Sequence, residues 1–344
     1  MHKIIEPAPA QWDEFVARHP RAHFLQQSAW GALKAAYGWR DLRVALAGDG
    51  GQIVAGAQVL LRRLPARLGT MAYLPMGPLV TGDDQWLALW GAVGKRVGKH
   101  KAAFLKCEPG IYLNETPPDF ARWGFVPSPQ TIQPPRTVLL DIRGDNDAIL
   151  ARMNQGTRRK IRQSQKNGIH YYEGTRADMS KFNALIQVTG TRNDFGVHEP
   201  AYYEKLYDLF VPSGHAALFI AEHEGDPLAA ILVPAQGKTA WYLAGASSNE
   251  KRNLMASYGI QWAAIQWARA RGCHYYDLWG IPDEDEATLE AQFQERSDGL
   301  WGVYGFKRGW GGQVVRAAGT WDKVYNPLVY NGYKAAVWLQ EQRS

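Results

Sequence analysis

The chain has 344 residues, 46% of them hydrophobic, and it contains 14 Trp and 16 Tyr. This composition supports well-packed cores and excludes a disordered chain, and the length favours two domains. With 39 Lys and Arg against 33 Asp and Glu, the net charge of +6 favours an anionic substrate or partner without demanding one.

The N-terminal stretch lacks the apolar centre of a signal peptide, and no run reaches the roughly 18 to 20 apolar residues of a membrane span. Cys107 and Cys273 both lie in apolar, strand-like runs. Such cysteines are typical of buried free thiols in a reducing compartment. We therefore expect a cytoplasmic protein that at most touches a membrane surface.

The first half predicts a mixed α/β unit. Residues 43–61 read as a hairpin with a Gly-Asp-Gly-Gly turn, and residues 71–75 as a short strand. Apolar residues then recur at helical spacing between Trp86 and Val97, and residues 102–109 read as a buried strand.

The basic segment GTRRKIRQSQKNG, residues 156–168, carries five Lys or Arg and no acid. It predicts a helix that ends at Gly168, with Ile161 as its one large apolar residue. Ile149, Leu150 and Met153 extend the apolar stripe, so the basic face should point outward. Such a face is either a solvated surface or a binding surface for phosphates.

The second half repeats the element order of the first. Residues 216–233 form a hairpin, 239–245 a strand, 257–272 a helix and 273–282 a closing strand. Each element of the first half lies almost the same number of residues before its equivalent in the second half. Gly50 precedes Gly225, and Lys106 precedes Leu278, by nearly the same interval. The sequence thus indicates a duplicated α/β unit.

The order of helices, meander, helix and strand is that of the acetyltransferase (GNAT) fold. An acyl-coenzyme A donor would bind where the long helix begins, with spaced glycines around the pyrophosphate. The second half has Arg252, Met255 and Ser257 there, and the first half has nothing similar. An acyl-coenzyme A donor is therefore disfavoured, but it remains an alternative.

Seven stretches together resemble the FemABX family of aminoacyl-tRNA-dependent peptidyltransferases, which add amino acids to the peptide of peptidoglycan precursors. They are QQSAWGALK (26–34), YLPMGPLV (73–80), LKCEP (105–109), GTRRKIRQSQKNG, TGTRNDF (189–195), YYDLWGIP (275–282) and YGFKRGWGG (304–312). The resemblance covers nearly the whole chain and implies two tandem GNAT-like domains with a substrate cleft between them.

The resemblance implies domains at residues 1–146 and 147–321, with segment 322–344 packing back onto the first. No heptad stretch occurs, so the chain is similar to the compact members that lack a coiled-coil arm. It departs from the family pattern at Met76, often Arg in the family, and at Glu108, more often Asp.

The Phe306–Lys307 pair is, by resemblance, the site for the tRNA end and the transition state. We expect both residues at a strand end. The Lys307 ammonium would stabilise the oxyanion that forms when an amine attacks an aminoacyl ester, while Phe306 stacks on the terminal adenine. Arg158, Arg159 and Lys160 are the candidate contacts to tRNA phosphates.

Cationic and aromatic side chains are the candidates for binding the acceptor. The resemblance makes Lys34 and Arg192 clamps for its anionic groups. Tyr37 and Trp39 compete for the aromatic position after Lys34. The further candidate aromatics, Tyr73 and Tyr242, are equally compatible with core packing.

Glu108 ends a predicted buried strand and has three readings: a general base, a group that orients the attacking amine, or a structural ion pair. No metal-ligand spacing, nucleotide-binding loop or dinucleotide motif occurs, so we expect neither a metal nor a cofactor.

The sequence therefore predicts a monomeric aminoacyltransferase of cell-wall synthesis. Its donor would be aminoacyl-tRNA, and its acceptor a UDP-MurNAc-pentapeptide or a lipid-linked muropeptide. Two alternatives stay open: an acyl-coenzyme A-dependent N-acyltransferase and a non-catalytic RNA-binding protein.

Overall fold

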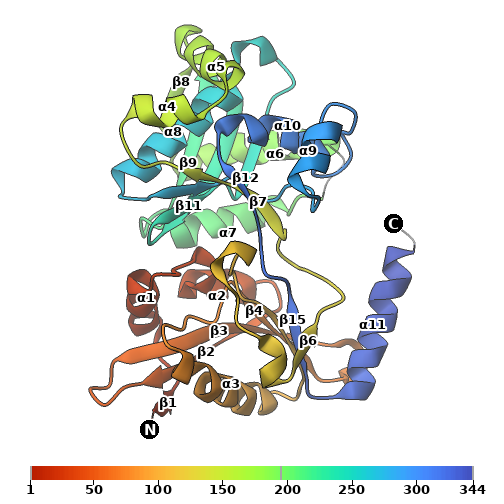
Figure 1. Cartoon of the computed structure of the whole chain (residues 1–344). Coiled ribbons are helices and arrows are strands. Elements are labelled where there is room, and N and C mark those ends of the chain that lie inside the picture. Colours follow the sequence, from red (N-terminus) through yellow and green to blue (C-terminus); the bar gives the residue numbers. More distant parts are fainter. Residues whose placement is uncertain (1, 194–195, 343–344) are drawn as a thin grey trace. The chain divides into compact units, whose positions relative to one another are not determined.

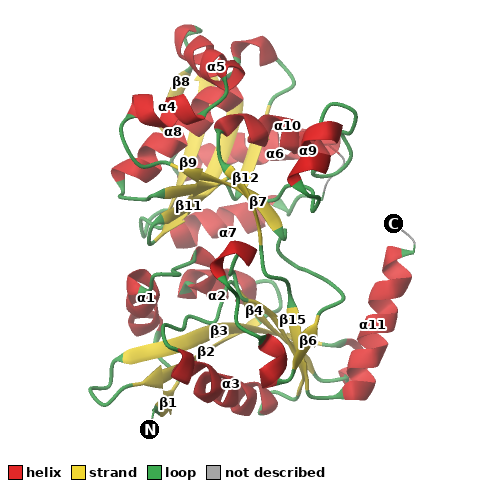
Figure 2. Ribbon diagram, viewed as in Figure 1, coloured by secondary structure: helices red, strands yellow, loops and turns green. Residues whose placement is uncertain are grey.

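A computed structural model describes residues 2–193 and 196–342 of the chain. They divide into two compact units, unit 1 of residues 1–135 with 316–344, and unit 2 of residues 136–315. Each unit holds one sheet with helices packed on it (Figure 1 and Figure 2). Unit 2 begins earlier than the predicted residue 147, because strand β7 (Arg136–Asp141) pairs with β13 (Tyr275–Asp277) of the second sheet.

The sheet of unit 1 has the strand order β1-β2-β3-β4-β5-β15-β6. Neighbouring strands are antiparallel except β4 and β5, which are parallel. The strands are β1 (Lys3–Ile5), β2 (Arg40–Ala47), β3 (Ile53–Arg63), β4 (Thr70–Pro75), β5 (Ala102–Glu108), β6 (Phe125–Pro127) and β15 (Trp321–Val324).

Helices cover both faces of this sheet. Helix α3 (Asp83–Gly98) packs Leu89 and Val93 against Val44 and Val59 in the largest core of unit 1. Side chains alternate along a strand, so Ala45 faces the other way, towards Trp12. That second face carries α1 (Pro9–Arg18), α2 (Ser28–Ala35) and the C-terminal helix α11 (Pro327–Glu341).

The sheet of unit 2 has the order β14-β7-β13-β11-β10-β9-β8, and β12 also pairs with β10. Strands β11 and β13 are parallel, whereas β10 is antiparallel to β9, β11 and β12, β13 to β7, and β8 to β9. The further strands are β8 (His170–Glu173), β9 (Ala216–His223), β10 (Asp226–Gln236), β11 (Thr239–Trp241), β12 (Ala244–Ser247) and β14 (Gln313–Arg316).

The core of unit 2 joins Ile231 and Val233 of β10 to Ile260 and Ile265 of helix α8 (Ala256–Ala270). Helix α6 (Met179–Asn193) also contacts β10, as well as β12. The remaining helices are α4 (Asn146–Arg152), α5 (Gln155–Lys166), α7 (Pro200–Phe210), α9 (Glu286–Gln292) and α10 (Trp301–Lys307).

The chain crosses between the units twice, and each crossing delivers a strand to the other sheet. After β6 of the first sheet it continues into β7, which pairs with β13. After β14 of the second sheet it returns as β15, which lies between β5 and β6. The second sheet is therefore built from one continuous stretch of the chain, whereas the first sheet takes β15 from beyond that stretch.

Candidate functional site

A cavity of about 550 Å³ opens in unit 2 beside the first turn of α8. The strand after β10 is interrupted beside it. Trp241 is the last residue that pairs with β13, whereas residues 244–247 pair with β10. The sequence had predicted one continuous strand over 239–245. Instead the strand breaks at Tyr242 and Leu243, and Tyr242 lines the cavity together with Gly245, Ala246 and Ser247.

Four of the predicted site residues line this cavity together: Lys160, Arg192, Tyr242 and Phe306. They come from helices α5, α6 and α10 and from the break after β11. Residues far apart in the sequence thus line one cavity in unit 2.

Lys307 lies next to the cavity and is buried. Its Nζ donates hydrogen bonds to the carbonyl oxygens of Trp279 (3.0 Å) and Gly280 (2.6 Å), and it lies 5.9 Å from the ring centre of Tyr242. Burial lowers the pKa of Lys307 from its usual 10.5 to about 7, and the nearby Asp277 carboxylate opposes that shift. An ammonium has three donor hydrogens, and only two find acceptors among the described residues.

The expectation that Phe306 and Lys307 occupy a strand end is wrong, since both lie in helix α10. Trp301, Tyr304 and Lys307 are all buried and recur every third residue, so one helical face carries them into the core. This periodicity was visible in the sequence and could have corrected the prediction.

Asp277, which the sequence analysis did not single out, shapes the turn that holds Lys307. Its carboxylate accepts hydrogen bonds from the Thr137 hydroxyl and from the backbone N–H of Trp279 (2.7 Å). Trp279 has a left-handed backbone (φ 58°), and its carbonyl and that of Gly280 point to the Lys307 Nζ. The predicted strand over 273–282 is correspondingly short, because β13 stops at Asp277 where this turn begins.

Aromatic and cationic side chains contact one another in the lining of the cavity. The Phe306 ring contacts the Tyr258 ring edge-on at 5.0 Å, and the Lys160 Nζ donates to the Tyr258 hydroxyl at 3.0 Å. Burial raises the pKa of Tyr242 to about 12, so this tyrosine is a neutral hydroxyl at physiological pH.

Arg192 reaches the same cavity from α6 in a fixed geometry. Its guanidinium donates to the carbonyl of Ser247 (3.0 Å) and to the side chain of Asn249 (2.8 Å). Burial, followed by the neighbouring Arg252, lowers the pKa of Arg192. Two residues of the motif that contains Arg192, at positions 194 and 195, lie outside the described residues.

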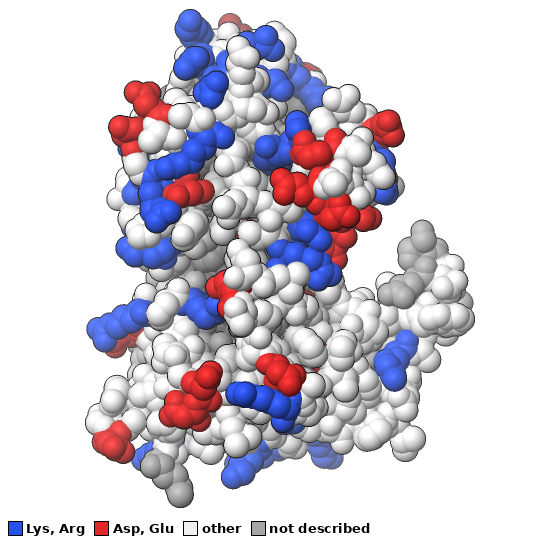
Figure 3. Space-filling view, viewed as in Figure 1, with Lys and Arg blue, Asp and Glu red and all other residues white. Residues whose placement is uncertain are grey.

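The basic helix α5 does not present its cations uniformly. Arg158 turns back to donate to the carbonyl of Met153 (2.8 Å), and Lys160 lines the cavity. Arg159, Arg162 and Lys166 are exposed, and their side chains have no hydrogen-bond or acidic partner among the described residues. Figure 3 shows Lys and Arg side chains gathered over α5. The outward basic face thus consists of Arg159, Arg162 and Lys166.

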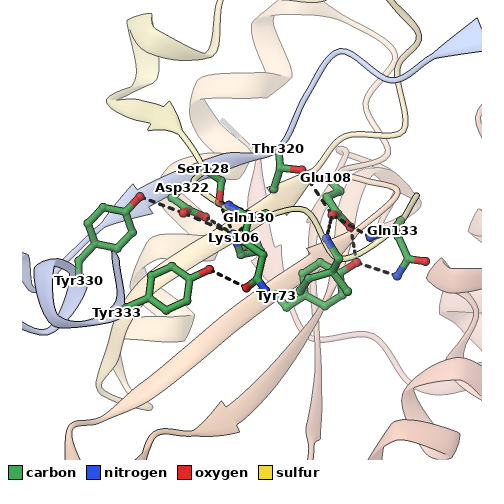
Figure 4. Close-up of polar contacts among 11 residues, drawn as sticks. Tyr73, Lys106, Glu108, Ser128, Gln130, Gln133, Thr320, Asp322, Tyr330 and Tyr333 are labelled. Atoms are coloured by element: carbon green, nitrogen blue, oxygen red, sulfur yellow. Dashed lines mark hydrogen bonds and ion pairs between the residues drawn. The ribbon is translucent and has the colours of Figure 1, made fainter. Parts of the chain in front are cut away.

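In unit 1, Glu108 lies buried at the end of β5 with four donors around it (Figure 4). The Tyr73 hydroxyl donates to Oε2, and Oε1 accepts from the N–H groups of Ile132 (2.6 Å) and Gln133 (3.0 Å) and from Thr320 (3.4 Å). Burial raises the pKa of Glu108, and the hydrogen bonds oppose that shift. These hydrogen bonds hold residues 132–133 at the C-terminal end of β5.

Of the other residues of unit 1 that were predicted to bind the acceptor, Trp39 lies near Tyr73. The Tyr73 ring is 6.2 Å from that of Trp39, and the Arg62 guanidinium lies 5.4 Å from the Trp39 ring centre. The Lys34 ammonium lies 4.7 Å from the Trp30 ring centre, as the helical spacing predicts, and burial followed by Arg62 lowers its pKa to about 8. Tyr37 is exposed on the turn after α2.

A second buried cluster was missed although its motif was noted. Lys106 of β5 is buried and pairs with Asp322 of β15 (3.3 Å), and it donates to Ser128 and to the carbonyl of Gln130 (Figure 4). The Tyr330 hydroxyl of α11 donates to the same Asp322 (2.9 Å). A lone lysine in the apolar run AAFLKCEP was the available signal, because buried lysines require partners. The cluster fastens the C-terminal segment to unit 1.

Among the described residues, no helix is long and apolar enough to cross a membrane. The FemAB family model matches residues 8–120, 125–225 and 214–337. A lipid II:glycine glycyltransferase of Staphylococcus saprophyticus is 26% identical over 395 aligned positions, which cover 92% of each chain. That alignment is longer than the present 344 residues, so the relative carries insertions that this chain lacks.

Solved structures support the same assignment at the level of fold. The crystal structure of FemX has a TM-score of 0.88 at 22% identity and covers 96% of this chain and 100% of its own. A tandem GNAT protein from the clavulanic acid pathway has a TM-score of 0.54 at 13% identity, covering 95% of this chain and 99% of its own. The predicted family and the predicted tandem GNAT-like fold are both confirmed. The protein thus belongs to the FemAB family and is a transferase.

Proposed function

We propose that this chain transfers an amino acid from an aminoacyl-tRNA to the peptide stem of a lipid-linked peptidoglycan precursor. The name of the staphylococcal relative, a lipid II:glycine glycyltransferase, supports the acceptor and the reaction class. Lys34, Trp39 and Tyr73 in unit 1 and Arg192 in unit 2 are the proposed contacts to the acceptor.

The fixed ammonium of Lys307 is the observation that carries this proposal. When an amine attacks the ester carbon of the donor, negative charge grows on the carbonyl oxygen, and the ester's tRNA hydroxyl leaves. The carbonyls of Trp279 and Gly280 hold Lys307 in place, and its third N–H remains available for that oxygen. Because the group is already oriented and shielded from water, no reorganisation is needed during the reaction.

Phe306 and the α5 face supply the proposed contacts to the tRNA. Phe306 lines the cavity next to Lys307, where an aromatic ring can stack on the terminal adenine. The exposed cations of α5 suit the phosphate backbone. Glu108, with its four donors, is proposed to position the 132–133 segment beside Tyr73, since each of its oxygens is already engaged.

The test replaces Lys307 by Met, which keeps the apolar stem and deletes the charge. We expect single-turnover transfer from purified aminoacyl-tRNA to fall by ~10²- to 10³-fold, with acceptor affinity retained. Lys307→Arg should restore little, because a planar guanidinium does not fit the place of a compact ammonium.

Lys323 offers a matched control, since it also donates to a carbonyl, that of Trp123, at 3.0 Å. Lys323→Met should leave transfer unchanged. Near-normal transfer by Lys307→Met would refute the mechanism. Tight acetyl-coenzyme A binding that is insensitive to Lys307→Met would instead favour an acyl-coenzyme A donor bound at the start of α8.

A further inference from the structure

The C-terminal helix α11 has an apolar face on each side. Its inner side packs on Phe104 of the sheet through Tyr330, and Val337, two turns further along the helix, is also buried. Its outer side carries Leu328, Trp338 and Leu339, whose exposed fractions are 85%, 59% and 50%. With 3.6 residues per turn, Leu328 and Leu339 lie roughly opposite the packed side, and Trp338 lies beside it. Figure 3 shows the visible face of α11 as almost entirely uncharged.

The turn between β3 and β4 extends this apolar surface at the N-terminal end of α11. Leu64 of the turn packs in the same cluster as Tyr330, so turn and helix are neighbours. Leu68, at the tip of the turn, is 51% exposed. The next residue, Gly69, adjoins Lys101, since a Cβ on Gly69 would lie 2.5 Å from the Lys101 carbonyl oxygen.

Cations accompany these apolar residues. Arg67 and Lys101 are exposed and have no acidic partner among the described residues. Lys334 lies within α11, whose one acidic residue is the last, Glu341. We call this surface the α11 patch: Leu68, Leu328, Trp338 and Leu339 with Arg67, Lys101 and Lys334.

We propose that the α11 patch docks on the surface of an anionic phospholipid bilayer. The proposal rests on the proposed function, because a lipid-linked acceptor is presented at such a surface. The expected lipid is a negatively charged phospholipid. The patch combines exposed apolar side chains with basic side chains, and none of the residues that define it is acidic.

Two physical arguments favour a bilayer over a second copy of the chain. Trp and Leu on a helix with basic neighbours are the residues that enter the boundary between headgroups and acyl chains. A symmetric dimer through this face would instead pack the patch against itself. That contact would place Arg67, Lys101 and Lys334 near their own copies with no acid in the patch to balance them.

The experiment measures cosedimentation of the whole protein with vesicles of phosphatidylcholine and phosphatidylglycerol. The wild type should bind them and should bind pure phosphatidylcholine vesicles much less. The variant Leu328→Asp/Trp338→Asp should lose binding by at least about tenfold. Arg67→Glu/Lys101→Glu should lose a similar factor at low salt, since each basic residue near an anionic surface contributes roughly fivefold.

Leu87 provides the matched control, because it is 70% exposed but lies on α3, away from the patch. Leu87→Asp should bind vesicles like the wild type. The patch variants should melt at the wild-type temperature, and they should transfer normally to a water-soluble UDP-linked acceptor while losing rate on a vesicle-borne one.

The outcomes separate the two proposals. A wild type that does not bind the anionic vesicles, or a Leu87→Asp variant as impaired as the patch variants, would overturn the docking surface. So would a concentration-dependent dimer that the patch variants abolish. The proposed function would stand in each case if Lys307→Met still stops transfer to the soluble acceptor.

Discussion

In the proposed mechanism, the charges of Lys307 and Asp277 set the pH range in which transfer is fast. Burial lowers the pKa of Lys307 to about 7, whereas the Asp277 charge pulls it upward. Below this pKa the lysine is an ammonium that can stabilise an oxyanion, and above it the charge is lost. The single-turnover rate should therefore fall as pH rises through about 7.

Asp277→Asn tests the origin of that pH dependence. The amide keeps an oxygen for Thr137 and for the Trp279 N–H but removes the negative charge that raises the pKa of Lys307. The falling limb of the rate profile should move to lower pH, as measured by single-turnover transfer across about pH 6 to 9. Thr137→Val, which keeps the carboxylate, should leave the limb in place. An unshifted limb in Asp277→Asn would show that Asp277 acts only on the fold.

Some residues of the candidate site could be predicted from the sequence, and others could not. Phe306 and Arg192 were named from their motifs and Tyr242 as a possible aromatic contact, and all three line one cavity in the structure. Asp277 was missed, because its role depends on a left-handed turn at Trp279 that no local sequence pattern predicts. Side chains that act through backbone geometry become visible only once the turn is known.

At the scale of elements, the α5 face makes a prediction about salt. Replacing the exposed cations Arg159, Arg162 and Lys166 by Ala should weaken tRNA binding. It should also flatten the salt dependence, because each phosphate contact releases counterions. Filter binding across salt concentrations measures the slope. Lys95→Ala/Lys205→Ala, which removes exposed cations from other helices, should leave it unchanged. An equal slope in all three proteins would make α5 a solvated surface.

Most elements were predictable because they follow one clear periodicity. The hairpins, the α3 and α8 helices and the buried β5 strand have regular apolar patterns, and the structure contains each of them. The elements that were predicted wrongly lie where burial and strand pairing override the local pattern. The motif YGFKRGWGG was expected at a strand end, yet burial of Trp301 and Tyr304 holds Phe306 and Lys307 in α10. Likewise, residues 244–247 pair with β10, so the predicted strand over 239–245 is divided into β11 and β12.

At the scale of the whole molecule, β15 makes unit 1 depend on the far end of the chain. This strand separates β5 from β6, and its Asp322 neutralises the buried Lys106. A fragment of residues 1–135 would expose one edge of β5 and leave that ammonium without its carboxylate. We expect this fragment to show no cooperative thermal transition by circular dichroism, whereas residues 136–315 should melt cooperatively. A cooperatively folded 1–135 fragment would contradict this account.

The late arrival of β15 also sets an order of events at the ribosome. Residues 1–135 are synthesised before unit 2, but the strand that completes their sheet is synthesised only after unit 2. Unit 2 can close its own sheet once residue 315 has left the exit tunnel. The nascent chain would thus finish its second unit before its first. Until β15 emerges, the unfinished edge of β5 is open to mispairing, which makes this interval the part of synthesis most exposed to aggregation.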